Sequence, residues 1–239
     1  MTASLVLCAH GTRDPLGRET VRAVVAAVAV RLPEATVLEA YVDVHGPELA
    51  EVVAGLPVGE RVSGVVVPLL LAGGYHVHVD IAQAVAGRPD VVATPALGPD
   101  DRLVEVVLDR LRASGAEQGC AVVLAPAGSS DARAQADSAV VAERLAQRWG
   151  GPVTVGYAAG PVPSVADAVR TARAEPGGGP VAVASYLLAP GFFQQRLEES
   201  GADVVTGPLA PDDRIVEVVV ERYRAALDRA VQDTAGPAV

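Results

Sequence analysis

Three residues that can bind a metal ion or accept a proton each follow an apolar run of the chain. His10 interrupts LVLCAHGTRDP, Asp43 comes after the run that ends at Tyr41, and His76 follows LLAGGY. Imidazole and carboxylate groups bind borderline divalent ions such as Fe²⁺, Co²⁺, Ni²⁺ and Zn²⁺, and a neutral imidazole also accepts protons. A single histidine at the end of a strand is more often a turn residue than a ligand, so further evidence from the sequence is needed.

The chain contains two related halves. Three stretches of the first half recur in the second: GPDDRLVEVVLDRL as APDDRIVEVVVERY, VLCAHGTRDP as VLAPAGSSDA, and LLAGGYHVHVD as LLAPGFFQQRL. Internal repeats of this length indicate two copies of one structural unit. The polar linker SGAEQG separates them. We therefore predict an N-terminal domain at residues 1–116, which carries the active site, and a degenerate repeat at residues 117–239, which forms the other wall of a cleft.

The second half lacks the candidate residues of the first. The aligned pairs are His10 and Ala127, Asp43 and Ala159, and His76 and Phe193. A purely structural role gives these polar residues little reason to vanish from one copy at three separate loops. The contrast predicts a single active site, in the first half.

Apolar strand candidates alternate with helical stretches in both halves. Strands are predicted at Ser4–Ala9, Thr36–Tyr41, Gly64–Leu71, Val91–Thr94, Cys120–Ala125, Val153–Ala158, Val181–Leu188 and Asp203–Thr206. The helices of the first half are predicted at Leu16–Leu32, Pro47–Gly55, Val77–Ala86 and Asp100–Ser114. Continuous apolar strands between helices are typical of parallel sheets covered on both faces. The predicted fold is α/β, with two tandem doubly wound domains that each contain a parallel four-stranded sheet. Ligands of such sheets bind at the carboxyl ends of the strands.

Composition and motif content exclude several classes of function. The formal net charge is −10, from 19 basic and 29 acidic residues, and no basic cluster occurs, so we do not expect a nucleic-acid partner. No apolar run reaches the length of a membrane helix and the start lacks a signal peptide, which predicts a cytoplasmic protein. Cys8 and Cys120 are expected as buried thiols. Motifs for nucleotide phosphates and for a serine nucleophile are missing.

Three motifs resemble those of the CbiX/SirB group of class II chelatases. Residues 10–15, HGTRDP, are similar to the turn after the first strand of that family. Tyr41-Val42-Asp43 with Pro47 is similar to its pattern after the second strand, although the family commonly has Glu where Asp43 stands. PLLLAGGYHVHVDI, residues 68–81, is similar to its third motif. The resemblance spans essentially the whole chain and implies a chelatase-like fold and a lyase that inserts a divalent metal ion into sirohydrochlorin.

The resemblance also implies roles for individual residues. His10 and His76 are the expected catalytic and metal-binding residues, and Asp43 and His45 are further candidate ligands. The carboxylate of Asp43 is one methylene shorter than that of Glu, so His45 is considered in its place. His78 stands two residues after His76, a spacing that on a helix turns it to another side.

The implied substrate sets the remaining expectations. The metal ion is a substrate, so no tightly bound cofactor is expected. Sirohydrochlorin carries eight carboxylates, for which Arg13 and the backbone N–H groups of Gly11 and Thr12 are candidate partners. The alternative for Arg13 is a solvated residue at a helix start. Phe193 is a candidate contact for the macrocycle, and the alternative is a core aromatic.

The residues leave the metal and the exact reaction open. Fe²⁺ insertion in sirohaem biosynthesis is favoured, whereas Co²⁺ insertion for cobalamin and a non-catalytic carrier of tetrapyrrole or metal are the alternatives. A monomer is expected, because the chain already contains both halves of a pseudo-dimer.

Overall fold

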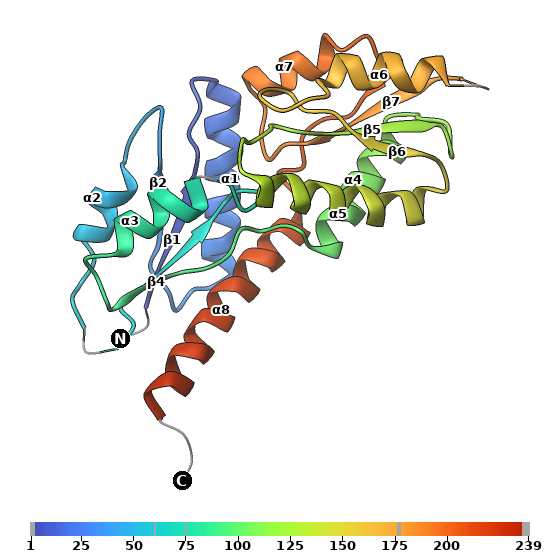
Figure 1. Cartoon of the computed structure of the whole chain (residues 1–239). Coiled ribbons are helices and arrows are strands. Elements are labelled where there is room, and N and C mark those ends of the chain that lie inside the picture. The colour runs from blue at the N-terminus through green and yellow to red at the C-terminus, as the bar shows by residue number, and fades with distance from the viewer. Residues whose placement is uncertain (1–2, 60, 75, 176–177, 236–239) are drawn as a thin grey trace.

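The computed structural model describes residues 3–59, 61–74, 76–175 and 178–235, without the side chains of residues 76–78 and 233–235. Two α/β units follow each other along the chain (Figure 1). The first contains β1 (Ser4–Ala9), α1 (Pro15–Arg31), β2 (Val37–Tyr41), α2 (Leu49–Ala54), β3 (Gly64–Pro68), the π-helix η1 (His76–Ile81), α3 (Ala82–Val85), β4 (Val91–Ala93) and α4 (Asp101–Ala113). The second contains β5 (Ala121–Pro126), α5 (Ala132–Trp149), β6 (Val153–Val155), α6 (Val165–Ala174), β7 (Val181–Tyr186), α7 (Phe192–Glu198), β8 (Val204–Val205) and α8 (Asp213–Ala235).

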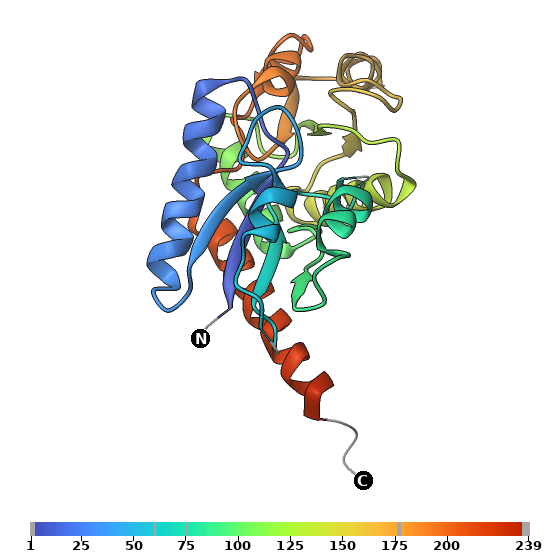
Figure 2. The same ribbon diagram turned by 90° about the vertical axis from the view of Figure 1, so that its left-hand side faces the viewer.

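Each unit is built on one parallel four-stranded sheet. The strand orders are β2-β1-β3-β4 and β6-β5-β7-β8, so the second sheet repeats the order of the first. All neighbouring strands are parallel. Helices cover the sheets on both faces (Figures 1 and 2). The predicted fold class is confirmed.

The alternation of side chains along β1 explains why its sequence is apolar throughout. All six residues of β1 are buried. Leu5 and Leu7 join the core between the two sheets, whereas Val6 and Cys8 join a separate cluster on the outer face, together with Leu49 of α2. Successive residues of a strand point to opposite faces, so a strand covered on both sides needs apolar residues at every position.

The last helix of each unit in the sequence packs against the other unit. α4 packs against β7 and α5 of the second unit, and α8 packs against β3 and α1 of the first. Figure 1 shows α8 running alongside the first unit and α4 beside the second. The buried hydroxyl of Tyr223 in α8 donates to the carbonyl oxygen of Ala3, 2.5 Å away. One core therefore joins both sheets through α4, α5 and α8.

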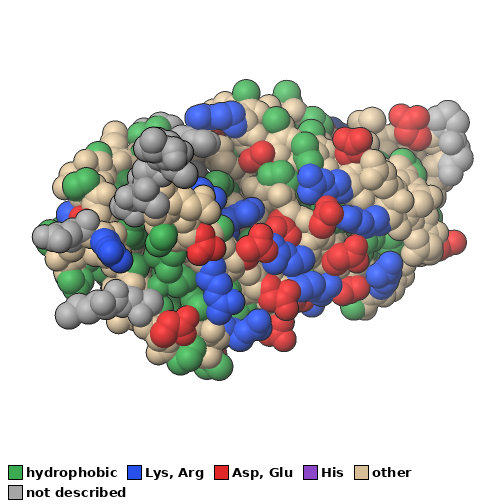
Figure 3. All heavy atoms as spheres, turned by 90° about the horizontal axis from the view of Figure 1, so that it is seen from below, with side chains coloured by type: hydrophobic (Ala, Val, Ile, Leu, Met, Phe, Trp, Pro, Cys, Tyr) green, Lys and Arg blue, Asp and Glu red, His purple; other side chains and the backbone are tan. Residues whose placement is uncertain are grey.

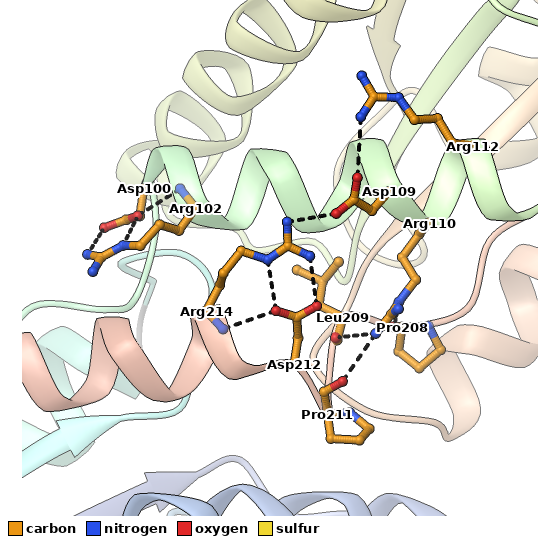
Figure 4. Close-up of polar contacts among 10 residues, drawn as sticks. All are labelled: Asp100, Arg102, Asp109, Arg110, Arg112, Pro208, Leu209, Pro211, Asp212 and Arg214. Carbon is orange, nitrogen blue, oxygen red and sulfur yellow. Dashed lines mark hydrogen bonds and ion pairs between the residues drawn. The ribbon is translucent and has the colours of Figure 1, made fainter. Parts of the chain in front are cut away.

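Ion pairs related by the repeat join α4 and α8. The guanidinium group of Arg214 lies 2.8 Å from Asp109 (Figure 4), and that of Arg102 lies 2.7 Å from Glu221. Arg110 donates to the carbonyl oxygens of the loop before α8. Arg222, the counterpart of Arg110, donates to the carbonyl oxygen of Leu97 at 3.3 Å. Each copy thus makes similar contacts with the other, which agrees with this stretch being the longest match between the halves.

Within each copy, an arginine also pairs with the aspartate two residues before it. Arg102 lies 2.8 Å from Asp100, and Arg214 lies 2.9 Å from Asp212. Each arginine lowers the pKa of its aspartate below the usual range, mainly through the side-chain hydrogen bond, while partial burial acts in the opposite direction.

Several strands are shorter than their apolar runs predict. β3 ends at Pro68 instead of Leu71, β6 at Val155 instead of Ala158, and β7 at Tyr186 instead of Leu188, and β8 contains only Val204–Val205. Beyond Pro68, the N–H of Leu69 donates to the carbonyl oxygen of Cys8 at 2.7 Å, and the carbonyl oxygen of Leu70 accepts from the N–H of Leu97 at 2.9 Å. Leu69 and Leu71 are buried in the core shared by the two units and Leu187 in the second cluster of the second unit, so burial keeps these residues apolar without a strand.

The helix predicted at Val77–Ala86 begins with a π-helix, His76–Ile81, and continues as α3. A helix of the wider π type is rare, and it is often found at functional sites.

The two cysteines differ in burial. Cys8 is buried in β1, and burial, with a smaller effect of the Asp80 carboxylate, raises its pKa to about 12. Cys120 is partly exposed, so the prediction of two buried thiols is correct for Cys8 and wrong for Cys120. Cys120 ends the linker between the halves, and its pKa is raised less strongly, chiefly by partial burial.

Acidic and basic side chains are mixed on the surface. Seen from below, both signs are interspersed over the middle and right of the molecule and do not form a patch of one sign (Figure 3). Between α4 and α5, Arg148 lies 3.2 Å from Asp101 and 3.4 Å from Glu105. None of the described helices combines the length and the apolar character needed to cross a membrane.

Candidate metal-insertion site

A cleft of about 830 Å³ lies where the carboxyl ends of the two sheets meet. The loops after β1, β2 and β3 line one side, and those after β5, β6 and β7 line the other. Sites for small molecules typically have volumes of about 300–1,000 Å³ and lie at such strand ends.

The turn after β1 brings His10 beside the loop after β2. Gly11 has a φ of 102°, and a Cβ there would overlap the carbonyl oxygen of Asp43. The carbonyl oxygen of His10 accepts from the N–H of Asp43 at 3.0 Å. Glycine is needed at position 11 both for the left-handed φ and for this close approach.

The same turn starts α1. The hydroxyl oxygen of Thr12 accepts from the N–H of Asp14 at 3.1 Å, and Asp14 in turn caps α1 by accepting from Leu16 N at 2.8 Å. Arg18 donates to the carbonyl oxygen of Thr12 at 2.8 Å. The first turn of α1 thus holds the residues that follow His10.

His10 and Asp43 both line the cleft. The side chain of His10 is half-buried, with its Nδ1 atom 3.4 Å from the carbonyl oxygen of Gly11. Asp43 is exposed, and its carboxylate accepts from the N–H of Val44 at 2.6 Å. Val44 has a φ of 69°, which is strained for a β-branched residue. Such strain is common at functional sites.

His45 does not join His10 and Asp43. Its ring packs against that of Tyr41, with 4.0 Å between the centroids, and it is not among the residues that line the cleft. Its Nδ1 atom lies 2.9 Å from the carbonyl oxygen of Gly46. Its Nε2 atom is buried and has no hydrogen-bond partner among the described residues.

The backbone of His76 begins η1, and its side chain lies outside the described part of the structure, as does that of His78. Gly74, two residues earlier, lines the cleft. Among the side chains that the structure describes, no three of the His, Cys, Asp and Glu type lie close enough to hold a metal ion together.

Arg13 and Phe193 also lie on the wall of the cleft. Arg13 is exposed, and no carboxylate of the described residues forms an ion pair with it. Phe192 and Phe193 begin α7 and are 63% and 37% exposed, with their rings in an edge contact at 5.6 Å. The alternative that these are core aromatics is therefore wrong.

Two tyrosines at the second-strand ends also line the cleft. Tyr41, the last residue of β2, and Tyr157, two residues after β6, occupy equivalent positions. Their recurrence in YVDVHGP and YAAGPVP is a signal that the sequence contains. Burial, followed by the nearby Glu39 carboxylate, raises the pKa of Tyr41 to about 12.

Solved structures with the same fold extend over nearly the whole chain. SirB from Bacillus subtilis with Fe³⁺ is 17% identical, with a TM-score of 0.74 over 99% of this chain and 98% of that chain. The sirohydrochlorin chelatase SirB from Bacillus subtilis subspecies spizizenii, in complex with cobalt, is 17% identical, with a TM-score of 0.72 over 96% and 97%. CbiX, the terminal enzyme of sirohaem biosynthesis in denitrifying bacteria, is 20% identical, with a TM-score of 0.66 over 94% and 99%.

Sequence comparisons assign the family. A search of curated proteins gave no match. The family model of CbiX matches twice, at residues 4–114 and 121–226, which together make up most of the chain. Each match spans one sheet and extends into the helix that follows its last strand, α4 or α8. The chain belongs to the CbiX family.

Proposed function

We propose that this protein is a sirohydrochlorin chelatase, a lyase that inserts Fe²⁺ into the macrocycle in sirohaem biosynthesis. The observation that carries the proposal is the cleft of about 830 Å³, with His10 and Asp43 on one wall, in a chain of the CbiX family. SirB and CbiX, which have the same fold, are by name a sirohydrochlorin chelatase and an enzyme of sirohaem biosynthesis.

Metal insertion exchanges one divalent ion for two pyrrole N–H protons. The unprotonated nitrogen of a neutral imidazole either binds the ion or accepts one of these protons. His10 on the cleft wall and His76 at the start of η1 are assigned these roles. The exposed carboxylate of Asp43 is a further ligand for the incoming ion, whereas His45, packed on Tyr41, is the weakest of the four candidates.

The anionic substrate needs positively charged partners, although the net charge of the protein is −10. Arg13 is exposed on the cleft wall and is assigned to a substrate carboxylate, together with the backbone N–H groups of Gly11 and Thr12. Phe193 offers an exposed ring for contact with the macrocycle.

The halves divide the work. Residues 1–116 supply the groups that act on the metal ion and the protons, and residues 117–239 supply the opposite wall. The protein acts as a monomer, because the pairing of its halves takes the place of a dimer. Light scattering at micromolar concentration tests this, and a stable dimer would contradict it.

The function is tested by an anaerobic absorbance time course with sirohydrochlorin and either Fe²⁺ or Co²⁺. We expect insertion faster than in the reaction without protein, with Fe²⁺ preferred. Faster insertion of Co²⁺ would instead indicate a cobaltochelatase. If neither metal reacts faster than the control while sirohydrochlorin still binds, the protein is a carrier.

A further inference from the structure

The loop between β3 and η1 connects the first sheet to His76, and side chains of the second half hold its backbone. In α5, the carboxylate of Asp137 accepts from the N–H of Gly73 at 2.8 Å. At the end of β7, the buried hydroxyl of Tyr186 donates to the carbonyl oxygen of Leu71, 3.3 Å away. Both contacts cross from the second half to the first, just before His76.

Neither contact has an equivalent in the opposite direction. The position of Gly73 in the other half is Pro190, which has no N–H to donate. Asp137 is matched by Thr20, whose hydroxyl donates to Leu16 of its own helix. These polar links therefore support only the loop of the half that retains its histidines.

The hydrogen bond made by Tyr186 also runs only from the second half to the first. Its counterpart after β3 is Leu69, which has no hydroxyl. A Cβ on Gly98 would overlap both the hydroxyl of Tyr186 and the carbonyl oxygen of Leu71. The aligned residue in the second half, Ala210, does carry a Cβ. Space for the tyrosine hydroxyl is thus kept only where it is used.

Tyr186 is suited to a lasting role as a donor. A phenol is already protonated at neutral pH, and burial of the Tyr186 side chain raises its pKa further. A buried carbonyl oxygen that loses its hydrogen-bond donor is costly. Both links therefore limit the positions that the loop before His76 can take.

Resting on the function proposed above, we propose that Asp137 and Tyr186 are positioning residues for metal insertion: the second half fixes the loop Leu71–Gly74, and with it the start of η1. The degenerate half thus sets the geometry of the active one in addition to closing the cleft.

The test compares Tyr186→Phe and Asp137→Ala with two control variants. Tyr223→Phe also removes one buried tyrosine hydrogen bond, but in α8 near Ala3, and Glu143→Gln removes an exposed charge from α5. We expect Tyr186→Phe and Asp137→Ala to lower kcat at least about tenfold, with little change in the affinity for sirohydrochlorin alone, because misplaced groups slow the reaction more than they weaken binding. Both controls keep the wild-type kcat.

A conservative variant separates the hydrogen bond from the charge. Asp137→Asn keeps a side-chain oxygen that can accept from Gly73 N. We expect a kcat within about threefold of wild type, since the geometry of the loop is retained. A kcat as low as that of Asp137→Ala would overturn the positioning role.

Hydrogen exchange without substrate gives a measurement that does not depend on chelatase activity. The segment from Leu71 to Ile81 is expected to exchange faster in Tyr186→Phe and Asp137→Ala than in the wild type and in both controls. Unchanged exchange, or kcat losses equal to those of the controls, would refute the inference. Lack of insertion by the wild-type protein would instead refute the proposed function, whatever the exchange shows.

Discussion

The turns after β1 and β5 have nearly the same backbone but different side chains. Gly11 and Gly128 have φ values of 102° and 103°. A Cβ on either would overlap the carbonyl oxygen of the neighbouring loop, at Asp43 in one half and at Ala159 in the other. The close contact between the first two loops is therefore common to both halves.

The hydrogen bonds that start the following helices are also shared. Thr12 accepts from the N–H of Asp14 at 3.1 Å, and Ser129 accepts from the N–H of Asp131 at the same distance. Both aspartates cap their helices. The turn is thus preserved wherever the fold depends on it.

The side chains to which we assign the chemistry are among those that differ between the two turns. His10 and Asp43 are replaced by Ala127 and Ala159 in the second half. The backbone hydrogen bond between the two loops is nevertheless present in both halves, with N–O distances of 3.0 Å and 2.9 Å. A structural requirement would have kept similar side chains in both copies. The comparison indicates that the first half has residues whose role is not structural, and the experiments below are designed to challenge this conclusion.

The largest effect is expected from separating the halves. A chain truncated after Gly119 loses α8, which covers β3 and α1, as well as one wall of the cleft. We expect no cooperative thermal unfolding and no metal insertion, because the apolar inner face of the first sheet is left exposed. Circular dichroism and the insertion assay measure both.

Addition of residues 120–239 to the truncated chain is the matching control, because it can restore the missing helix and restore activity. A folded, monomeric fragment 1–119 that inserts metal at the full-length rate would show that the second half is dispensable.

The next largest effect is expected at the strand ends. His10→Ala and His76→Ala should each lower the rate of insertion at least about 10²-fold, as loss of an acid–base group or ligand does. Unfolding temperatures should stay close to that of the wild type. The mirror-image change, Ala127→His, should leave the rate unchanged, because the second half also lacks a counterpart of Asp43. Recovery of activity when Ala127→His is added to His10→Ala would mean that both halves can carry the site.

A smaller effect is expected on the apolar wall. Phe193→Ala should raise KM about two- to tenfold with little change in kcat, since it removes contact area that binds the ground state and the transition state alike. Val162→Ala, at an exposed apolar residue that does not line the cleft, serves as control. A fall in kcat without a change in KM would assign Phe193 a different role.

The smallest effect is expected at the equivalent aspartate–arginine pairs before α4 and α8, and it should be equal in the two halves. Asp100→Asn and Asp212→Asn keep the cap but lose the charge paired with arginine, and each should lower the free energy of unfolding at pH 7 by about 1 kcal/mol. The folded-state pKa of each aspartate is lowered, so its contribution is present above about pH 4 and is lost as the pH falls through the folded-state value. Chemical unfolding at pH 7 and at a pH below the folded-state pKa of the aspartates tests this. Clearly unequal losses would show that α4 and α8 are not equivalent.

Much of the fold is predictable because its signals are local. Apolar runs such as Ser4–Ala9 predict buried parallel strands, and Gly11 and Asp14 mark the turn and the helix start. The repeat predicts the second sheet from the first. His10 and Asp43 reach one edge because parallel strands end there together.

The remaining features depend on contacts between distant residues. A repeat does not reveal which sheet each terminal helix covers, so the exchange of α4 and α8 is not apparent from it. The residues up to Leu71 form an apolar run because the other half buries them. This run predicts a longer strand than the one observed, which ends at Pro68. Asp137 and Tyr186 are unremarkable in the sequence, since their partners lie in the opposite half.

The exchanged helices also affect the order in which the protein can be completed during its synthesis. α4 is made before β5–β8, so the second sheet finds its covering helix already present. The first sheet is made early, but its covering helix, α8, follows all eight strands. Domains generally fold as they leave the ribosome, N-terminal first. Here the first domain to be made has one face covered only in part, by α1, and this face is completed by the last helix of the second domain.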